Sequence, residues 1–186
     1  MPIQPIAPIH MSIVIETGLR ALGLFYVLSG VVVVRALAIS AMADAAHAAI
    51  MGAPPHPAER AREIWLAAGS VLIGAGGLAL ALLIDVAAML FVLGALQQLI
   101  YLVIVAPRFL DPHDAPDAGG RAKTWQAAVA YLVVTVLVVT AAKTGVLRPW
   151  QDMPAWLLAA ASAAVILGAA WTIRALAVRN STGTAE

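Results

Sequence analysis

The chain has 186 residues, of which 62% are hydrophobic and 11% charged, with a net charge of +1 and no cysteine. Soluble domains average about 45–50% apolar and about 25% charged residues, so this composition is typical of a membrane protein. The small net charge excludes the concentrated basic field of a nucleic-acid-binding surface. The absence of cysteine excludes disulfides, thiol nucleophiles and iron–sulfur ligation.

The N-terminus carries prolines at positions 2, 5 and 8 and lacks the basic segment of a standard secretory signal peptide. Each proline biases the residue before it away from the helix, which predicts an extended tail over residues 1–12. We expect a single transmembrane helical domain over residues 13–177. The polar segment 178–186 is predicted to be a disordered C-terminal tail.

Five apolar stretches follow one another along the chain, each close to the ~20 residues that cross a ~30 Å hydrocarbon core. They are Thr17–Ile39, Ile64–Ile84, Val86–Ala106, Trp125–Ala142 and Ala155–Ile173. They predict an all-α integral membrane bundle of five transmembrane helices, a four-helix core plus one. The alanine-rich segment 41–52 either extends the first helix or lies along the membrane interface.

Charged and turn-forming residues mark the connections. Asp85 is the only charge between Glu63 and Arg108, and a single helix over that distance would be ~65 Å long. The chain is therefore predicted to turn near Asp85 and form a tight helical hairpin. Pro107 is expected to end the third helix, because a proline ring crowds the preceding turn. A polar loop is expected over residues 109–123.

Lysine and arginine set the predicted orientation. Most of them fall on the side of the 41–63 loop, which we call end A; the opposite side is end B. The end A residues are Arg60, Arg62, Arg108, Arg121, Lys123, Arg174 and Arg179, with Arg35 nearby, and the end B residues are Arg20, Lys143 and Arg148. The positive-inside rule then places the C-terminus in the cytoplasm and the N-terminus outside, in a bacterial inner membrane. All five tryptophans fall near predicted span ends, as in an interfacial aromatic belt.

Two strips of small residues indicate close helix packing. Ser70, Gly74 and Gly77 share one face of the second helix, and Ala160, Ala164 and Gly168 recur every fourth residue on the fifth. Helices in lipid associate by close backbone approach at such strips. For the second helix we expect packing against its hairpin partner. The fifth helix, being terminal, is the better candidate for contact with another subunit.

The polar residues within the spans are the candidate ligand-binding groups. Arg35 has no carboxylate within a turn on its own helix, and it either extends to the lipid headgroups or binds an anion, a quinone oxygen or a lipid headgroup. Gln97 and Gln98 lie near the middle of the third span, with Tyr101 one turn beyond. They form either interhelical hydrogen bonds or, with Arg35, a polar cavity for a quinone or small solute. No cofactor is predicted; a quinone or lipid is the alternative occupant.

Histidines do not indicate a buried redox centre, because all four lie outside the spans. No helix offers the buried histidine pair of a b-type haem. His47, His56 and His113 on end A are candidate zinc ligands, but their irregular spacing over two loops favours solvated loop residues. The sequence contains no phosphate-binding loop, nucleophile elbow or HExxH motif.

Part of the chain resembles the DoxX-like membrane proteins. The resemblance covers RALGLFYVLSGVVVV, the proline-bearing loop APPHPAER and the hairpin VLIGAGGLALALLIDVAAMLFVLGALQQLIYL, about Arg20 to Ala106. It implies a four-helix membrane bundle and an accessory or redox-associated role, sometimes linked to thiosulfate:quinone chemistry. The chain departs from the family by lacking a glutamate inside the second helix, by carrying Asp85 at the hairpin turn and by having a fifth helix. No active residue is carried over.

Three functions remain open from the sequence. The first is a non-catalytic membrane subunit, an accessory or structural component of a larger or homo-oligomeric complex in the lipid bilayer. The second is a small-solute or ion transporter, although the spans lack the acidic residues that couple protons. The third is a quinone-linked, DoxX-like redox component whose cofactor a partner would hold. The missing catalytic and metal-ligand sets favour the first.

Overall fold

The computed structural model describes residues 7–51, 57–110 and 118–181, and these are helical almost throughout. The helices are α1 (Ala7–Met51), α2 (Pro57–Ala81), α3 (Val86–Ile100), α4 (Ala118–Lys143) and α5 (Ala155–Ser181). A π-helix, η1 (Tyr101–Leu110), continues α3, and a short 3₁₀ turn, η2 (Trp150–Asp152), precedes α5. Within the described residues the structure has no strand, only a single bridge between Ile84 and Arg148.

Each of the five apolar stretches forms a helix that is long and apolar enough to cross a membrane. These spans are Ser12–Ala43, Arg60–Ala81, Val86–Phe109, Gly119–Lys143 and Ala155–Arg174. The prediction of an all-α chain with five apolar helices is therefore confirmed. The second connection, between α2 and α3, turns at Asp85 as predicted, and the fourth connection, between α4 and α5, contains Arg148 and Pro149.

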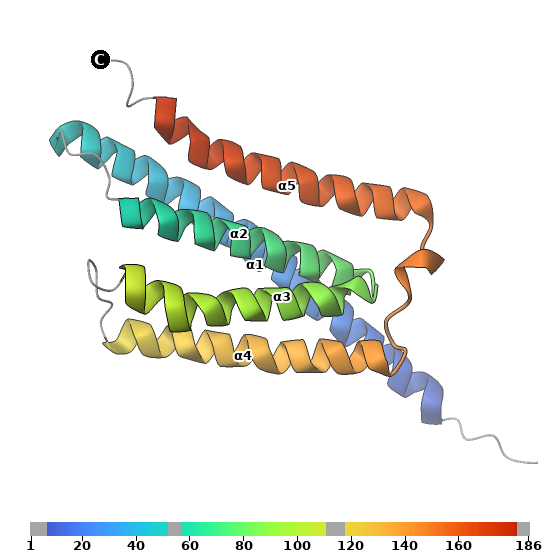
Figure 1. Ribbon diagram of the computed structural model, residues 1–186. Coiled ribbons are helices and arrows are strands. Elements are labelled where there is room, and N and C mark those ends of the chain that lie inside the picture. The colour runs from blue at the N-terminus through green and yellow to red at the C-terminus, as the bar shows by residue number, and fades with distance from the viewer. Residues whose placement is uncertain (1–6, 52–56, 111–117, 182–186) are drawn as a thin grey trace, which may run out of the picture.

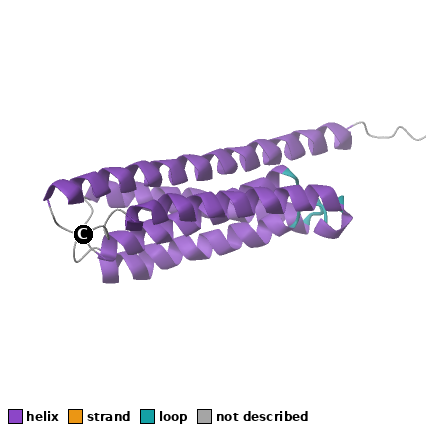
Figure 2. Ribbon diagram, turned by 90° about the horizontal axis from the view of Figure 1, so that it is seen from above, coloured by secondary structure: helices purple, strands orange, loops and turns teal. Residues whose placement is uncertain are grey.

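In Figure 1, α2, α3 and α4 lie side by side, α1 crosses this layer obliquely on one face, and α5 lies along the edge formed by α2. Figure 2 shows the same bundle from above, with the long α1 on one side of the others. α1 begins and α5 ends at opposite ends of the bundle, as an odd number of antiparallel helices requires. Of the five, α5 contributes least to the interior: its apolar segment is the least buried.

Several helices are longer than the sequence predicts. α1 begins at Ala7 rather than after residue 12, because Pro8 falls in the first turn, where its missing N–H would have no intrahelical partner. The alanine-rich segment continues α1 as far as Met51. α4 starts at Ala118, so residues 118–123, expected in a loop, are helical. α5 runs to Ser181, four residues into the predicted tail, and residues 1–6 and 182–186 lie outside the described chain.

Pro107 does not end the third span, contrary to the prediction. The chain continues helically to Leu110, but from Tyr101 onward the winding is that of a π-helix. Proline cannot donate the hydrogen bond of the α-helix, and its ring crowds the carbonyl four residues earlier. A wider turn relieves that crowding, and π-helical turns are one of the irregularities that occur within α-helices.

Aromatic side chains from three helices form the centre of the bundle. The ring of Tyr26 on α1 meets Phe91 on α3 edge-on, with centroids 5.2 Å apart, and meets Tyr131 on α4 at 5.6 Å. Phe91 and Tyr131 stack at 5.5 Å with an interplanar angle of 12°. Around them pack buried aliphatic side chains, including Leu80, Leu83 and Val138. The edge-on and the stacked arrangements of these rings are both favoured geometries for aromatic pairs.

The α2–α3 turn and the α4–α5 connection bind each other at end B. Leu83 takes the left-handed conformation (φ +57°) that ends α2, and the burial of its side chain offsets the strain of that backbone geometry. Arg148 donates its N–H to the Leu83 carbonyl at 2.7 Å, and Asp85 donates its N–H to the Arg148 carbonyl at 2.9 Å. The Asp85 carboxylate also accepts the Trp150 N–H at 3.1 Å. The connection to α5 is thus tied to the hairpin that the sequence predicts.

Candidate functional site

The polar residues of the third span meet α2 near end A. Gln97 donates its side-chain N–H to the Trp65 carbonyl at 3.1 Å, across the α2–α3 interface. The approach is possible because Gly69 has no side chain: a Cβ built there would lie 3.2 Å from the Gln97 Nε2. One turn further, the Tyr101 ring stacks on the Trp65 indole, with centroids 6.4 Å apart and an interplanar angle of 29°. Trp65 thus joins Gln97 and Tyr101 into one cluster.

The π-helix begins at this cluster. Tyr101 is its first residue, and the Tyr101 N–H points to the carbonyls of both Gln97 and Gln98. Gln97 and Tyr101 are four residues apart, so both side chains reach α2 from one face of the helix. The stack on Trp65 and the Gln97 hydrogen bond anchor the helix immediately before its winding changes.

Gln98 is not part of the Trp65 cluster. It is half-buried, and its amide has no hydrogen-bond partner among the described residues. Adjacent positions on a helix point ~100° apart, so Gln98 faces away from α2 when Gln97 faces it. The two neighbouring amides therefore have different surroundings, as their spacing predicts.

The contacts of α1 with α2 fix the level of Arg35 in the bundle. Gly30 of α1 lies opposite Ser70 of the antiparallel α2, with only 2.9 Å between a Cβ built at Gly30 and the Ser70 carbonyl oxygen. A Cβ at Gly30 would also lie 3.3 Å from the Gly74 Cα, so Arg35, five residues further along α1, is level with about residue 67 of α2, less than a turn from Trp65. Arg35 is exposed and ~140° around α1 from Gly30, so it lies on a different face from the one that packs on α2. It has no ion-pair or hydrogen-bond partner among the described residues.

The small-residue strip of α2 packs against α1, not against the hairpin partner α3 as expected. A Cβ built at Gly77 would lie 2.7 Å from the Gly23 carbonyl oxygen and 2.8 Å from the Val27 nitrogen, both backbone atoms of α1. Ser70, in the same strip, lies opposite Gly30. Gly23 and Gly30, seven residues apart, are the matching small residues on α1, and they were not among the predicted packing positions.

The strip of α5 has different surroundings. Ala160, Ala164 and Gly168 are all exposed, and a Cβ built at Gly168 would meet no atom within 4 Å. Thr172, the next residue in the repeat, is buried, and its hydroxyl donates to the Gly168 carbonyl at 2.8 Å. Three of the four small positions therefore face outward.

The candidate metal ligands cannot be placed. His56 and His113 lie outside the described residues, and the His47 side chain, although its backbone belongs to α1, is also outside them. Among the side chains that are described, no group of three or more His, Cys, Asp or Glu residues is close enough to hold a metal ion.

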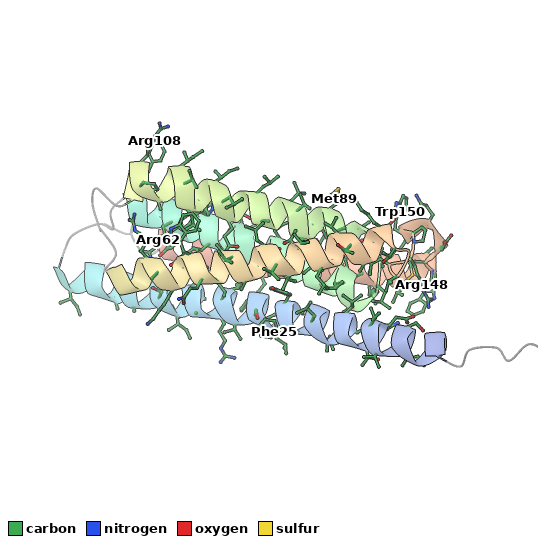
Figure 3. All side chains as sticks on the ribbon, turned by 90° about the horizontal axis from the view of Figure 1, so that it is seen from below. Phe25, Arg62, Met89, Arg108, Arg148 and Trp150 are labelled. Atoms are coloured by element: carbon green, nitrogen blue, oxygen red, sulfur yellow. The ribbon has the colours of Figure 1, made fainter. Side chains whose placement is uncertain are left out.

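Charged side chains gather at the two ends of the bundle. Figure 3 shows Arg62 and Arg108 at one end and Arg148 with Trp150 at the other. Between these ends the described interior offers aromatic rings, hydroxyls and amides. Such groups donate and accept hydrogen bonds, and none is an ionised acid or base at neutral pH.

Comparison with known proteins adds no relative. No protein-family model matches the chain, and neither the curated proteins nor the solved structures contain a significant match.

Proposed function

We propose that the chain is a non-catalytic polytopic membrane subunit that acts as a structural or accessory component of a homo-oligomeric or larger complex. The outward-facing strip of Ala160, Ala164 and Gly168 on α5 carries this proposal. The comparable strip on α2 already packs against α1, and there the two helix backbones lie close together. A partner helix in lipid would approach the α5 strip in the same way.

The membrane location is supported by the dimensions of the bundle. Sixteen residues separate Trp65 from the end of α2 at Ala81, or ~24 Å, close to the ~30 Å hydrocarbon core. Large apolar side chains cover the outside of the helices, among them Leu28, Val133 and Leu167 at about two-thirds exposure. Arg35, less than a turn from the level of Trp65, can then extend its guanidinium to the headgroups of end A.

The orientation belongs to the same proposal. End A carries the larger share of arginine and lysine, so we place it in the cytoplasm of a bacterial inner membrane, with the N-terminus outside. The DoxX-like resemblance of residues 20–106 supports an accessory role beside a redox enzyme. Any redox cofactor would then belong to the partner.

The test compares two leucine substitutions on α5. Gly168→Leu places a bulky side chain in the exposed strip, and Ala170→Leu places the same side chain ~200° around the helix, also on an exposed position. The measurement is the oligomeric mass after mild detergent extraction from the native membrane. We expect Gly168→Leu to reduce the mass and Ala170→Leu to leave it unchanged. A wild-type chain that is only an isolated monomer, or a Gly168→Leu variant with unchanged mass, refutes the proposal.

A further inference from the structure

The hydroxyl of Tyr131 is a buried polar group without a hydrogen-bond partner in the described part of the chain. The residue is only 5% exposed, and it lies well inside the described segment 118–181. Its hydroxyl makes no hydrogen bond with any described residue. A buried tyrosine hydroxyl nearly always has a partner, because leaving the group unpaired costs about 1–3 kcal/mol.

Gly94 determines where this hydroxyl lies. A Cβ built at Gly94 would be 2.5 Å from the Tyr131 hydroxyl oxygen, so the phenol end occupies the notch that the glycine leaves on α3. The ring itself is fixed by stacking on Phe91, one turn earlier on the same face of α3. The hydroxyl is therefore directed at the surface of α3, away from solvent at either end of the bundle.

Gln98 is a polar side chain on that surface of α3. It follows Gly94 by four residues, and positions four apart on a helix lie one above the other. Helical side chains lean toward the N-terminus of their own helix, which brings the Gln98 amide back toward Gly94. This amide is also half-buried and has no partner among the residues that the structure describes, in contrast to Gln97, whose amide donates to the Trp65 carbonyl.

Both groups offer donors that an oxygen atom between them would accept. The tyrosine hydroxyl has one O–H, and the amide has two N–H groups and a carbonyl. A bridging oxygen satisfies a buried hydroxyl and a half-buried amide that do not bond each other directly, which is the usual role of an internal water. An oxygen of a small apolar molecule lying against the aromatic rings would satisfy them equally well.

We propose that the Tyr131 hydroxyl and the Gln98 amide together bind an acceptor oxygen that is not part of the described chain, beside Gly94 between α3 and α4. The site lies in the interior of one chain, so it does not depend on the assembly proposed for α5. The oxygen comes from a water molecule or from a small hydrophobic molecule with a carbonyl or hydroxyl.

A double-mutant cycle tests the shared oxygen. The variants are Tyr131→Phe, which removes only the hydroxyl, Gln98→Leu and the double substitution, each followed by thermal unfolding in one detergent. We expect Tyr131→Phe to lower the midpoint by about 2–4 °C, as the loss of one buried hydrogen bond in a chain of this size would. In the Gln98→Leu background, where the oxygen has lost its second partner, the same substitution should lower it clearly less.

The adjacent amide is the matched control. In a Gln97→Leu background the effect of Tyr131→Phe should be the same as in the wild type, because Gln97 faces α2. A Tyr131→Phe variant with an unchanged or raised midpoint means that the hydroxyl has no partner, and the proposal fails. Equal effects in the Gln98→Leu and wild-type backgrounds also overturn it.

Native mass spectrometry then identifies the source of the oxygen. If the wild type carries an added mass that Tyr131→Phe lacks, the oxygen belongs to a small hydrophobic molecule. Coupling in the cycle without such a mass identifies water.

Discussion

Replacing Gly77 by alanine should separate α1 from α2. The added methyl group would lie 2.7 Å from the Gly23 carbonyl oxygen and 2.8 Å from the Val27 nitrogen. Non-bonded heavy atoms pack at about 3.5–4.0 Å. Both atoms belong to the α1 backbone, so no side chain can rotate away and the whole helix must shift.

The expected change in stability of Gly77→Ala is the sum of two opposing effects. Overpacking of a close contact costs about 1–3 kcal/mol. Alanine is favoured over glycine inside a helix by about 1 kcal/mol, which offsets part of that loss. Gly74→Ala separates the two effects, because a Cβ at Gly74 meets no atom within 4 Å. The difference between the two variants should therefore equal the overpacking alone, about 1–3 kcal/mol.

The assay is thermal unfolding of wild type, Gly77→Ala and Gly74→Ala in the same detergent, followed by circular dichroism. One kcal/mol corresponds to about 2–4 °C for a chain of this size, so Gly77→Ala should melt at least about 2 °C below Gly74→Ala. The melting temperature of Gly74→Ala should equal or exceed that of the wild type. If Gly77→Ala is as stable as Gly74→Ala, then the α1 backbone does not approach α2 closely at Gly77.

Three further predictions concern the connections and the topology. Asp85→Ala should destabilise the protein by about 1 kcal/mol and speed hydrogen exchange at the Trp150 amide, whereas Asp85→Asn, which keeps an acceptor oxygen, should do neither. Gln97→Leu should cost about 0.5–1 kcal/mol in thermal unfolding, through the lost bond to the Trp65 carbonyl. A reporter that is active only in the cytoplasm, fused after residue 186, should be active, and the same reporter fused before residue 1 should be silent.

Each of these has a contrary result. Unchanged exchange at Trp150 in Asp85→Ala means that the α4–α5 connection does not depend on the carboxylate. If Gln97→Leu is as stable as the wild type, then the Gln97 amide does not help to hold α2 against α3. A reporter that is silent at the C-terminus reverses the orientation.

The aromatic and polar residues near end A illustrate what local pattern can predict about the site. The spacing of Gln97, Gln98 and Tyr101 predicts that the two amides face different surroundings, and it identifies Gln97 as a candidate for an interhelical bond. The same spacing cannot identify Trp65 as the residue that Gln97 and Tyr101 share. Trp65 is 32 residues from Gln97 along the chain, and only the packing of α2 on α3 brings them together.

Helix boundaries show a related limit. Pro8 predicts an extended tail and Pro107 predicts the end of a helix, both from steric crowding by the proline ring, yet Pro8 lies in a first helical turn and Pro107 is accommodated by π winding. The steric clash of a proline makes the α-helix less favourable at that position. The neighbouring turns then decide whether the helix ends there or continues with a wider winding. The stack of Tyr101 on Trp65 holds the helix against α2 where the winding changes.

The order and length of the apolar stretches by themselves determined the five helices and the turn at Asp85, because hydropathy and helix length depend on residues that are neighbours in the chain. The tertiary structure decided which surfaces meet. Gly23 and Gly30 are matched to the strip of α2, the α5 strip remains exposed, and Tyr131 is directed at Gly94. These contacts join residues far apart in sequence, and their energies depend on the distance and angle between helices, which no periodicity within one helix contains.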